Sequence, residues 1–247
     1  MALAGDLSAA EVTSVMPGRP LRTYPALLST GVDAQAWARS GAPAGAVVVA
    51  DYQASPRGRG GWPWTVEAGR DLGFSMVLRP ELTAEREGWL YLVVTSALAD
   101  VVGSTAAAEW PDEVRAGDRR AGAVGVVAEL GADGVDWAVA DVVVHGAGPP
   151  RAPMLAAVVA AIEERATQAE ATVLADYVPR CATMGRRVRA RVVPLGPAGA
   201  VVTGRAVDVL GDGALVVETD EGRRVAVRPQ SLGALESDPP PASRRSG

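Results

Sequence analysis

The sequence predicts an α+β protein, in which a mixed β-sheet with packed helices is followed by a small β-barrel. Up to about residue 186, valine-rich runs alternate with stretches of helical periodicity. After that point, four short strand patterns follow one another, separated by turn pairs such as Asp212-Gly213 and Glu221-Gly222. Apolar residues make up 48% of the 247-residue chain and aromatic residues only 4%, so Ala, Val and Leu are expected to fill the core.

The elements expected before residue 186 are, in chain order, a helix over 33–40, strands over 45–52 and 72–78, a helix over 83–102, strands over 123–130 and 137–144, and a helix that begins near Pro153. Asp33 is the expected N-cap of the first helix, and Gly41 follows its end. The sequence Gly131-Ala-Asp-Gly134 predicts a hairpin between the two later strands. The barrel strands are expected over 188–193, 201–210, 214–218 and 223–227.

Four segments follow from these patterns. Residues 1–24 lack periodicity, and we expect a flexible N-terminal arm there. Residues 25–186 form the larger predicted domain and residues 187–236 the smaller one, with Arg186-Arg187 at the boundary. The tail over 237–247 contains three consecutive prolines and is expected to be disordered.

Charge and cysteine content restrict the class of function. A net charge of −5 and a pI near 5.1 argue against a nucleic-acid partner, which would require clustered positive charge. The single cysteine, Cys181, fits a reducing compartment. The first residues lack the basic and apolar regions of a signal peptide, and no apolar run reaches membrane-spanning length. We therefore expect a cytoplasmic protein without a membrane partner.

The most informative segment is the loop between the strands predicted over 45–52 and 72–78. It contains Arg57-Gly58-Arg59 and then Gly61 and Trp64. Guanidinium groups beside backbone amides that glycine leaves uncovered are suited to binding a carboxylate or a phosphate. The chain also contains no lysine, so all 24 of its basic residues are arginines.

This loop resembles the biotin-binding loop of biotin protein ligases, whose pattern is Gly-Arg-Gly-Arg-x-Gly-x-x-Trp, with Pro56 in place of the first Gly. Ser-Thr and Gln residues of that family also have counterparts in the right order. The resemblance implies that Ser29, Thr30 and Gln53 bind the ureido head of biotin. It also implies that Arg57, Gly58 and Arg59 hold the carboxylate and the phosphate, and that Trp64 stacks on adenine.

Further segments extend the resemblance over residues 27–235. The family's Lys-Trp-Pro-Asn-Asp motif corresponds to residues 109–113, which makes Asp112 and Glu113 candidate Mg²⁺ ligands, although surface carboxylates are the more ordinary interpretation. The Lys-x-Ala-Gly-Ile-x-x-Glu segment matches either 119–122 or 124–129, and Arg119 and Arg120 are the candidate catalytic residues. The C-terminal strands match the family's SH3-like domain.

The resemblance implies a biotin/lipoate ligase-like fold and ATP-dependent, Mg²⁺-dependent activation of biotin. Biotinyl-adenylate would form first, and biotin would then pass to a lysine of a biotin carboxyl carrier protein. A catalytically impaired paralogue that binds biotin, its adenylate or a partner protein is the alternative, and a lipoate or octanoyl ligase is a weaker third. Only about 25 residues precede Leu27, so we expect no DNA-binding domain. The sequence leaves open whether the chain forms a homodimer.

The departures from the family pattern concentrate on the adenylation chemistry. The lysine before Trp-Pro is replaced by Glu109, which reverses the charge, and the lysine before Ala-Gly is replaced by arginine. The family's Gly-x-Gly-Ile-Asn strand end is replaced by residues 140–144, so its Asn is lost. His145 is expected to be a turn residue rather than a general base, and Cys181 a packing residue.

Overall fold

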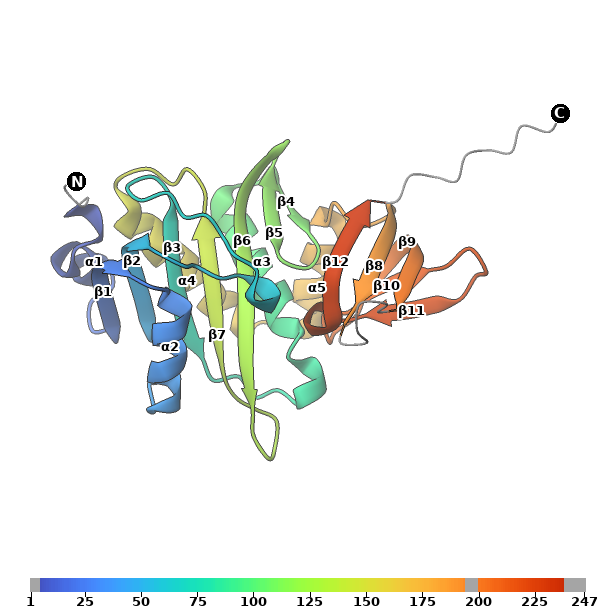
Figure 1. Cartoon of the computed structure of the whole chain (residues 1–247), viewed down its shortest axis with the longest axis horizontal. Coiled ribbons are helices and arrows are strands. Elements are labelled where there is room, and N and C mark those ends of the chain that lie inside the picture. Colours follow the sequence, from blue (N-terminus) through green and yellow to red (C-terminus); the bar gives the residue numbers. More distant parts are fainter. Residues whose placement is uncertain (1–4, 194–199, 238–247) are drawn as a thin grey trace.

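The computed structural model describes residues 5–193 and 200–237. Its larger sheet has seven strands in the order β1-β2-β3-β7-β6-β5-β4 (Figure 1). Only the β1–β2 pair is parallel, so the sheet is mixed, as predicted. The strands are β1 (Leu21–Leu27), β2 (Val47–Gln53), β3 (Leu72–Leu78), β4 (Ala106–Glu109), β5 (Glu113–Ala116), β6 (Arg119–Leu130) and β7 (Val135–Val144).

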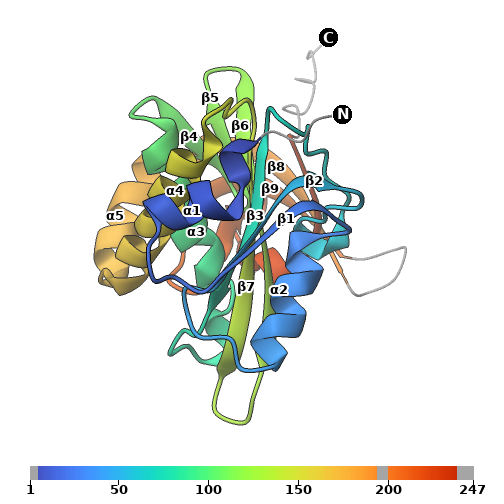
Figure 2. The same cartoon turned by 90° about the vertical axis from the view of Figure 1, so that its left-hand side faces the viewer.

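Helices cover both faces of this sheet (Figure 2). Strand alternation explains the two layers, because Val47 and Val49 of β2 pack into one core and Val48 into the other. Helix α2 (Thr30–Arg39) covers the Val48 face through Ala34 and Ala38. The opposite face carries α1 (Ala9–Val15), α3 (Trp89–Val102) and α4 (Arg151–Thr167), and α5 (Glu170–Arg180) packs beside α3.

The C-terminal strands form a separate antiparallel sheet in the order β11-β10-β9-β8-β12. They are β8 (Arg187–Val192), β9 (Val201–Val209), β10 (Leu215–Glu218), β11 (Arg224–Val227) and β12 (Leu232–Ser237). Among the described residues, the edge strands β11 and β12 do not pair with each other, so the predicted barrel is an open five-stranded sheet. No strand of this sheet pairs with the larger one in the described part of the chain.

The two sheets share one apolar cluster at their junction. Trp89 of α3, Trp110 after β4 and Tyr177 of α5 pack with Leu215, Val217 and Leu232 of the smaller sheet. The Trp110 indole N–H also donates to the carbonyl of Gly213 at 2.9 Å. Whether residues 187–236 fold independently of residues 25–186 therefore stays a prediction, because part of their core comes from the larger domain.

The expected flexible arm over residues 1–24 is wrong for the described residues 5–24. A short 3-10 helix (Gly5–Leu7) and α1 precede β1, with Ser8 capping α1, and Leu7, Val12 and Met16 are buried against α4 and the sheet. Asp6 also pairs with the fully buried Arg151 at 2.7 Å. The few buried residues here are separated by small and polar residues, so the sequence shows no clear helical periodicity. Residues 1–4 lie outside the described part, as does the predicted tail apart from Ser237.

Two helix boundaries differ from the expectation. Helix α2 begins at Thr30 with Ser29 as its N-cap, so Asp33 lies in its first turn and pairs with Arg22 at 3.2 Å. The helix expected over 83–102 is split by Gly88 into a 3-10 turn (Ala84–Arg86) and α3. In the described residues no helix is both long and apolar enough to cross a membrane.

Candidate functional site

The Arg/Gly loop leaves β2 after Gln53 and crosses the sheet over β6. Its backbone is tied to itself by hydrogen bonds from Gly58 N to Trp62 O at 2.8 Å and from Trp64 N to Pro56 O at 3.0 Å. A Cβ on Gly58 would lie 2.0 Å from the indole nitrogen of Trp64, so Gly58 is what allows the indole to lie against the loop backbone. Gly60 and Gly61 have φ values of 62° and 77°, which glycine adopts without strain.

The polar residues that the sequence assigned to the ligand head come together beneath this loop. Ser29 and Thr30 stand at the start of α2, and Gln53 is the last residue of β2. The Thr30 amide and hydroxyl both donate to Gln53 Oε1, at 2.9 and 3.1 Å. All three side chains are buried. The start of α2 and the end of β2 thus hold a small polar cluster inside the protein.

Two further residues, which sequence reasoning missed, complete this cluster. Ser75 of β3 and Asp141 of β7 are register partners on adjacent strands. Ser75 Oγ lies 2.5 Å from Asp141 Oδ1 and 2.8 Å from the Thr30 hydroxyl. The signal was present, because Asp141 is a lone carboxylate in the middle of a valine-rich strand, where an ionisable group needs a specific reason.

The protonation of Asp141 follows from its surroundings. Burial raises the pKa of Asp141 to about 7, and the hydrogen bond with Ser75 opposes this only in part. Proton counting agrees, because each hydroxyl carries one proton. A neutral Asp141 can donate to Ser75, Ser75 to Thr30 and Thr30 to Gln53, which supplies one proton to each contact. An ionised Asp141 would leave one of the three contacts without a proton.

The cavity within this cluster is almost filled. Its volume is about 10 Å³, and its lining includes Ser29, Gln53, Arg57, Trp64 and Asp141. Arg57 itself is exposed at the rim and donates to the carbonyl of Gly61 at 3.3 Å. We name this cluster of Ser29, Thr30, Gln53, Ser75 and Asp141, together with its cavity, the head pocket.

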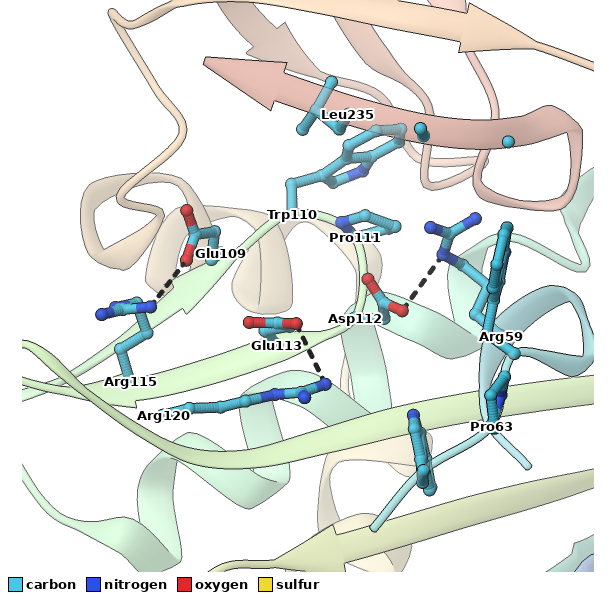
Figure 3. A pocket seen from close by; sticks show the side chains of 14 residues that line it. Arg59, Pro63, Glu109, Trp110, Pro111, Asp112, Glu113, Arg115, Arg120 and Leu235 are labelled. Carbon is cyan, nitrogen blue, oxygen red and sulfur yellow. Dashed lines mark hydrogen bonds and ion pairs between the residues drawn. The ribbon is translucent and has the colours of Figure 1, made fainter. Parts of the chain in front are cut away.

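A much larger cavity of about 610 Å³ opens on the other side of the loop, between the loop and β12 (Figure 3). We name it the charged cavity. Its ionisable lining residues are Arg59, Arg115 and Arg120 and the carboxylates Glu109, Asp112 and Glu113. Trp62, Trp64 and Trp110 also line it.

Every carboxylate in the charged cavity is paired with an arginine (Figure 3). Arg59 Nε lies 3.1 Å from Asp112, Arg120 lies 3.0 Å from Glu113, and Arg115 lies 3.5 Å from Glu109. Burial raises the pKa values of Asp112 and Glu113, although Arg59 and Arg120 oppose the effect. Three arginines and three carboxylates leave the lining with no formal net charge.

The two candidate catalytic arginines take different places. Arg120 lines the charged cavity, whereas Arg119 points elsewhere and donates to the carbonyl of His145 at 3.3 Å. Successive residues of a strand face opposite sides, and both arginines belong to β6. His145 Nδ1 lies 3.1 Å from Asp71 in a turn, away from both cavities, and Cys181 is packed in the apolar junction.

The two candidate metal ligands, Asp112 and Glu113, both lie in the charged cavity. In residues 5–193 and 200–237, no group of three or more His, Cys, Asp or Glu side chains stands close enough to hold a metal ion. Asp112 and Glu113 are two adjacent carboxylates that face the charged cavity. Mg²⁺ in nucleotide sites commonly binds to one or two carboxylates plus the substrate phosphates, and this pair satisfies that lesser requirement.

Comparison with known proteins gives consistent results. The family described as the biotin protein ligase C terminal domain matches residues 183–229. The biotin–acetyl-CoA-carboxylase ligase of Mycobacterium tuberculosis is 31% identical over 225 residues, covering 81% of this chain and 83% of that protein. The bifunctional ligase/repressor BirA of Bacillus subtilis is 30% identical over 138 residues, covering 52% of this chain but only 42% of BirA, so the match spans less than half of that relative.

A solved structure shares the fold. The biotin protein ligase from Aquifex aeolicus in complex with biotin and ATP superposes with a TM-score of 0.68 at 21% identity, covering 88% of this chain and 99% of that one. At this level of identity the likeness concerns the fold, and it extends over both sheets.

Proposed function

The chain belongs to the biotin protein ligase family, and from this we propose that it activates biotin with ATP and transfers it to a carrier protein. In the first step the biotin carboxylate attacks the α-phosphorus of ATP, giving biotinyl-adenylate and pyrophosphate. In the second, a lysine amine of a biotin carboxyl carrier protein attacks the acyl carbon, and AMP leaves. The proposed compartment is the cytoplasm.

The observation that carries this proposal is the meeting of three distant segments in the charged cavity. Arg59 comes from the loop, Asp112 from the Trp110-Pro111 segment and Arg120 from β6. The head pocket lies on the other side of the same loop, with Trp64 and the loop backbone between the two. A ligand head in one pocket and a nucleotide in the other would therefore bring a carboxylate and an α-phosphate together at the loop.

Each residue has a role in this proposal that its chemistry supports. Arg57 and Arg59 would hold the carboxylate and the phosphate through charge-assisted hydrogen bonds. Arg120, rather than Arg119, would supply the positive charge that the family's lysine provides, because it faces the charged cavity. Trp64, which is half-buried and lines the charged cavity, would offer its indole ring to adenine. Catalysis of this kind depends on position and electrostatics.

Mg²⁺ has a defined place in this proposal. Asp112 and Glu113 would provide its protein ligands and the nucleotide phosphates the rest. When bound, the ion supplies positive charge that offsets the triphosphate. This matters here because the arginines of the charged cavity are already neutralised by carboxylates. Binding of the nucleotide with its metal would have to exchange these internal ion pairs for new ones.

A second function is favoured by two specific observations. The head pocket holds only about 10 Å³ of free space, and Glu109 places a carboxylate where the family carries a lysine. Glu109 contacts Arg115 at 3.5 Å and Arg186 at 3.6 Å, so the reversed charge is accommodated within the protein. These features support a non-catalytic paralogue that binds a biotin-derived ligand or a partner protein.

Pyrophosphate release separates the two functions. The purified chain is incubated with ATP and Mg²⁺, with and without biotin, beside an Arg59→Ala variant. A ligase releases pyrophosphate only with biotin and loses this on removal of Arg59. Arg223→Ala is the matched control, because Arg223 lies exposed in the β10–β11 turn. Biotin-independent or absent release by the wild type contradicts the ligase proposal and leaves the paralogue.

A further inference from the structure

Asp141 takes part in the hydrogen-bonded polar cluster of the head pocket. Its carboxyl group meets Ser75 at 2.5 Å, and Ser75 in turn meets Thr30 at 2.8 Å. Thr30 is committed to Gln53 Oε1 through both its amide and its hydroxyl. The hydroxyls of Ser75 and Thr30 and the side-chain oxygen of Gln53 are therefore satisfied from within the protein.

Asp141 also occupies the space of a ligand. Its carboxylate packs directly against Gly31, where a Cβ would lie 2.5 Å from Asp141 Oδ1. The remaining cavity of about 10 Å³ is at the lower limit for a single water molecule. A fused two-ring head such as that of biotin does not fit beside this side chain.

The carboxyl group is stable in this position. Asp141 is buried, and its β7 backbone is fixed by register pairing with both β3 and β6. The raised pKa of Asp141 means that it is largely neutral below about pH 7, so its burial does not bury a full charge. The side chain is thus held by its own hydrogen bonds and not expelled by its charge.

We propose that Asp141 is an internal plug of the head pocket, which occupies the place of the acyl head and sets which heads can enter. A biotin-sized head binds only when the Asp141 side chain moves out or is removed. The inference rests on the proposed function in one respect, since it takes the head pocket to be the acyl site. It concerns specificity and not catalysis, because Asp141 lies away from the charged cavity.

The test is calorimetric titration with biotin at pH 7, without ATP, on folded variants at position 141. Asp141→Gly removes the plug and should bind biotin roughly 10- to 100-fold more tightly than the wild type, the range expected for one or two displaced buried hydrogen bonds. Asp141→Asn keeps the volume and should bind like the wild type. The matched control is Asp136→Gly, the same change on the same strand at an exposed position, which should leave binding unchanged.

Asp141→Ala carries the same test if the glycine variant does not fold, with a smaller gain in the same direction. Equal biotin affinity in the wild type and in the glycine and alanine variants overturns the plug, and so does a complete lack of binding in all of them. The ligase proposal is tested by a separate measurement, the release of pyrophosphate. Tighter binding by Asp141→Gly with no pyrophosphate release from any variant supports the plug and contradicts the ligase. If the wild type releases pyrophosphate and binds biotin as tightly as Asp141→Gly does, the ligase proposal is supported and the plug is contradicted.

Discussion

The head pocket and the charged cavity lie on opposite sides of one loop and differ in free space and in charge. In the head pocket Ser29, Thr30 and Gln53 come together, and the side chain of Asp141 fills space among them, so that only about 10 Å³ is left. The charged cavity has a volume of about 610 Å³, and its carboxylates are balanced by ion pairs with arginines. One region is polar, neutral and almost filled, and the other is open and lined by paired charges.

This comparison shows why retained motif residues are weak evidence for retained ligand binding. Ser29, Thr30 and Gln53 are in place, yet Thr30 and Gln53 are hydrogen-bonded to each other, and Thr30 is linked to Asp141 through Ser75. A polar residue inside a protein needs a partner whether or not a ligand is present. Four predictions test this contrast.

The largest expected effect belongs to the charged cavity. If ligase activity is present, Arg59→Ala should lower biotin-dependent pyrophosphate release by about 100- to 1000-fold, the range seen when one preorganised donor to developing charge is removed. Removing Arg59 also leaves Asp112 without its partner at 3.1 Å. Arg223→Ala, which removes an exposed arginine outside the cavity, is the control and should leave the release unchanged. An equal loss in both variants would trace the effect to net charge and not to the charged cavity.

The protonation of Asp141 in the head pocket should make the stability of the protein depend on pH. The folded-state pKa of Asp141, about 7, exceeds the unfolded value near 3.9, so the folded state holds its proton more tightly. The stability from this group is complete below about pH 4 and is lost as pH rises toward 7. Relative to Asp141→Asn, the wild type should lose about 2.6 kcal/mol between pH 5 and pH 8 in denaturant unfolding. Parallel curves for the two proteins would show that the carboxyl is not held neutral.

The fit of Asp141 against α2 can be tested by overpacking. Gly31→Ala places a Cβ 2.5 Å from Asp141 Oδ1, and we expect a loss of about 1–3 kcal/mol in the free energy of unfolding. Gly5→Ala is the control, because nothing lies within 4 Å of its added Cβ. Combining Gly31→Ala with Asp141→Gly should cost less than the sum of the single changes. Strict additivity would mean that the two residues do not compete for the same space.

The smallest effect concerns Glu109. Glu109→Lys should raise biotin-dependent pyrophosphate release by about five- to tenfold if its charge limits nucleotide binding, equivalent to about 1 kcal/mol, the energy of a close charge pair in water. Its ion pairs with Arg115 and Arg186 are long and partly exposed, so stability should change by less than about 1 kcal/mol. Glu221→Lys, on an exposed turn, is the charge-matched control. An equal rise in both variants would trace the gain to net charge alone.

The sequence predicted the fold where the patterns were strong. The valine-rich strands β2, β3, β6 and β7 and the separate C-terminal sheet were all expected, because buried central strands are continuous apolar runs. The edge strands β1 and β12 and the short β4 and β5 were not. Residues 21–27 are half-exposed and contain a proline, so their strand conformation depends on pairing with β2. Whether such segments form strands depends on pairing with neighbouring strands and not on the local sequence pattern.

For the candidate site, the loop and the polar head residues were predicted from the order of motifs. Asp141 was not, because its effect depends on its register against Ser75 and on its contact with Gly31, which lies more than a hundred positions away in sequence. The choice between Arg119 and Arg120 also needed the direction in which each side chain leaves β6. Cross-strand geometry of this kind cannot be predicted from local sequence patterns.

Arg59 has one more partner, the carbonyl of Leu232 at the start of β12 in the smaller sheet. The same guanidinium that is proposed to meet a phosphate therefore acts as a clasp between the two parts of the molecule. An anion in the charged cavity that draws Arg59 away from Leu232 breaks this contact. The apolar junction around Trp110 and the hydrogen bonds of Trp110 and Arg86 to the turn before β10 then hold the parts together. Binding of an anion in the charged cavity should therefore be detectable as faster amide hydrogen exchange along β12.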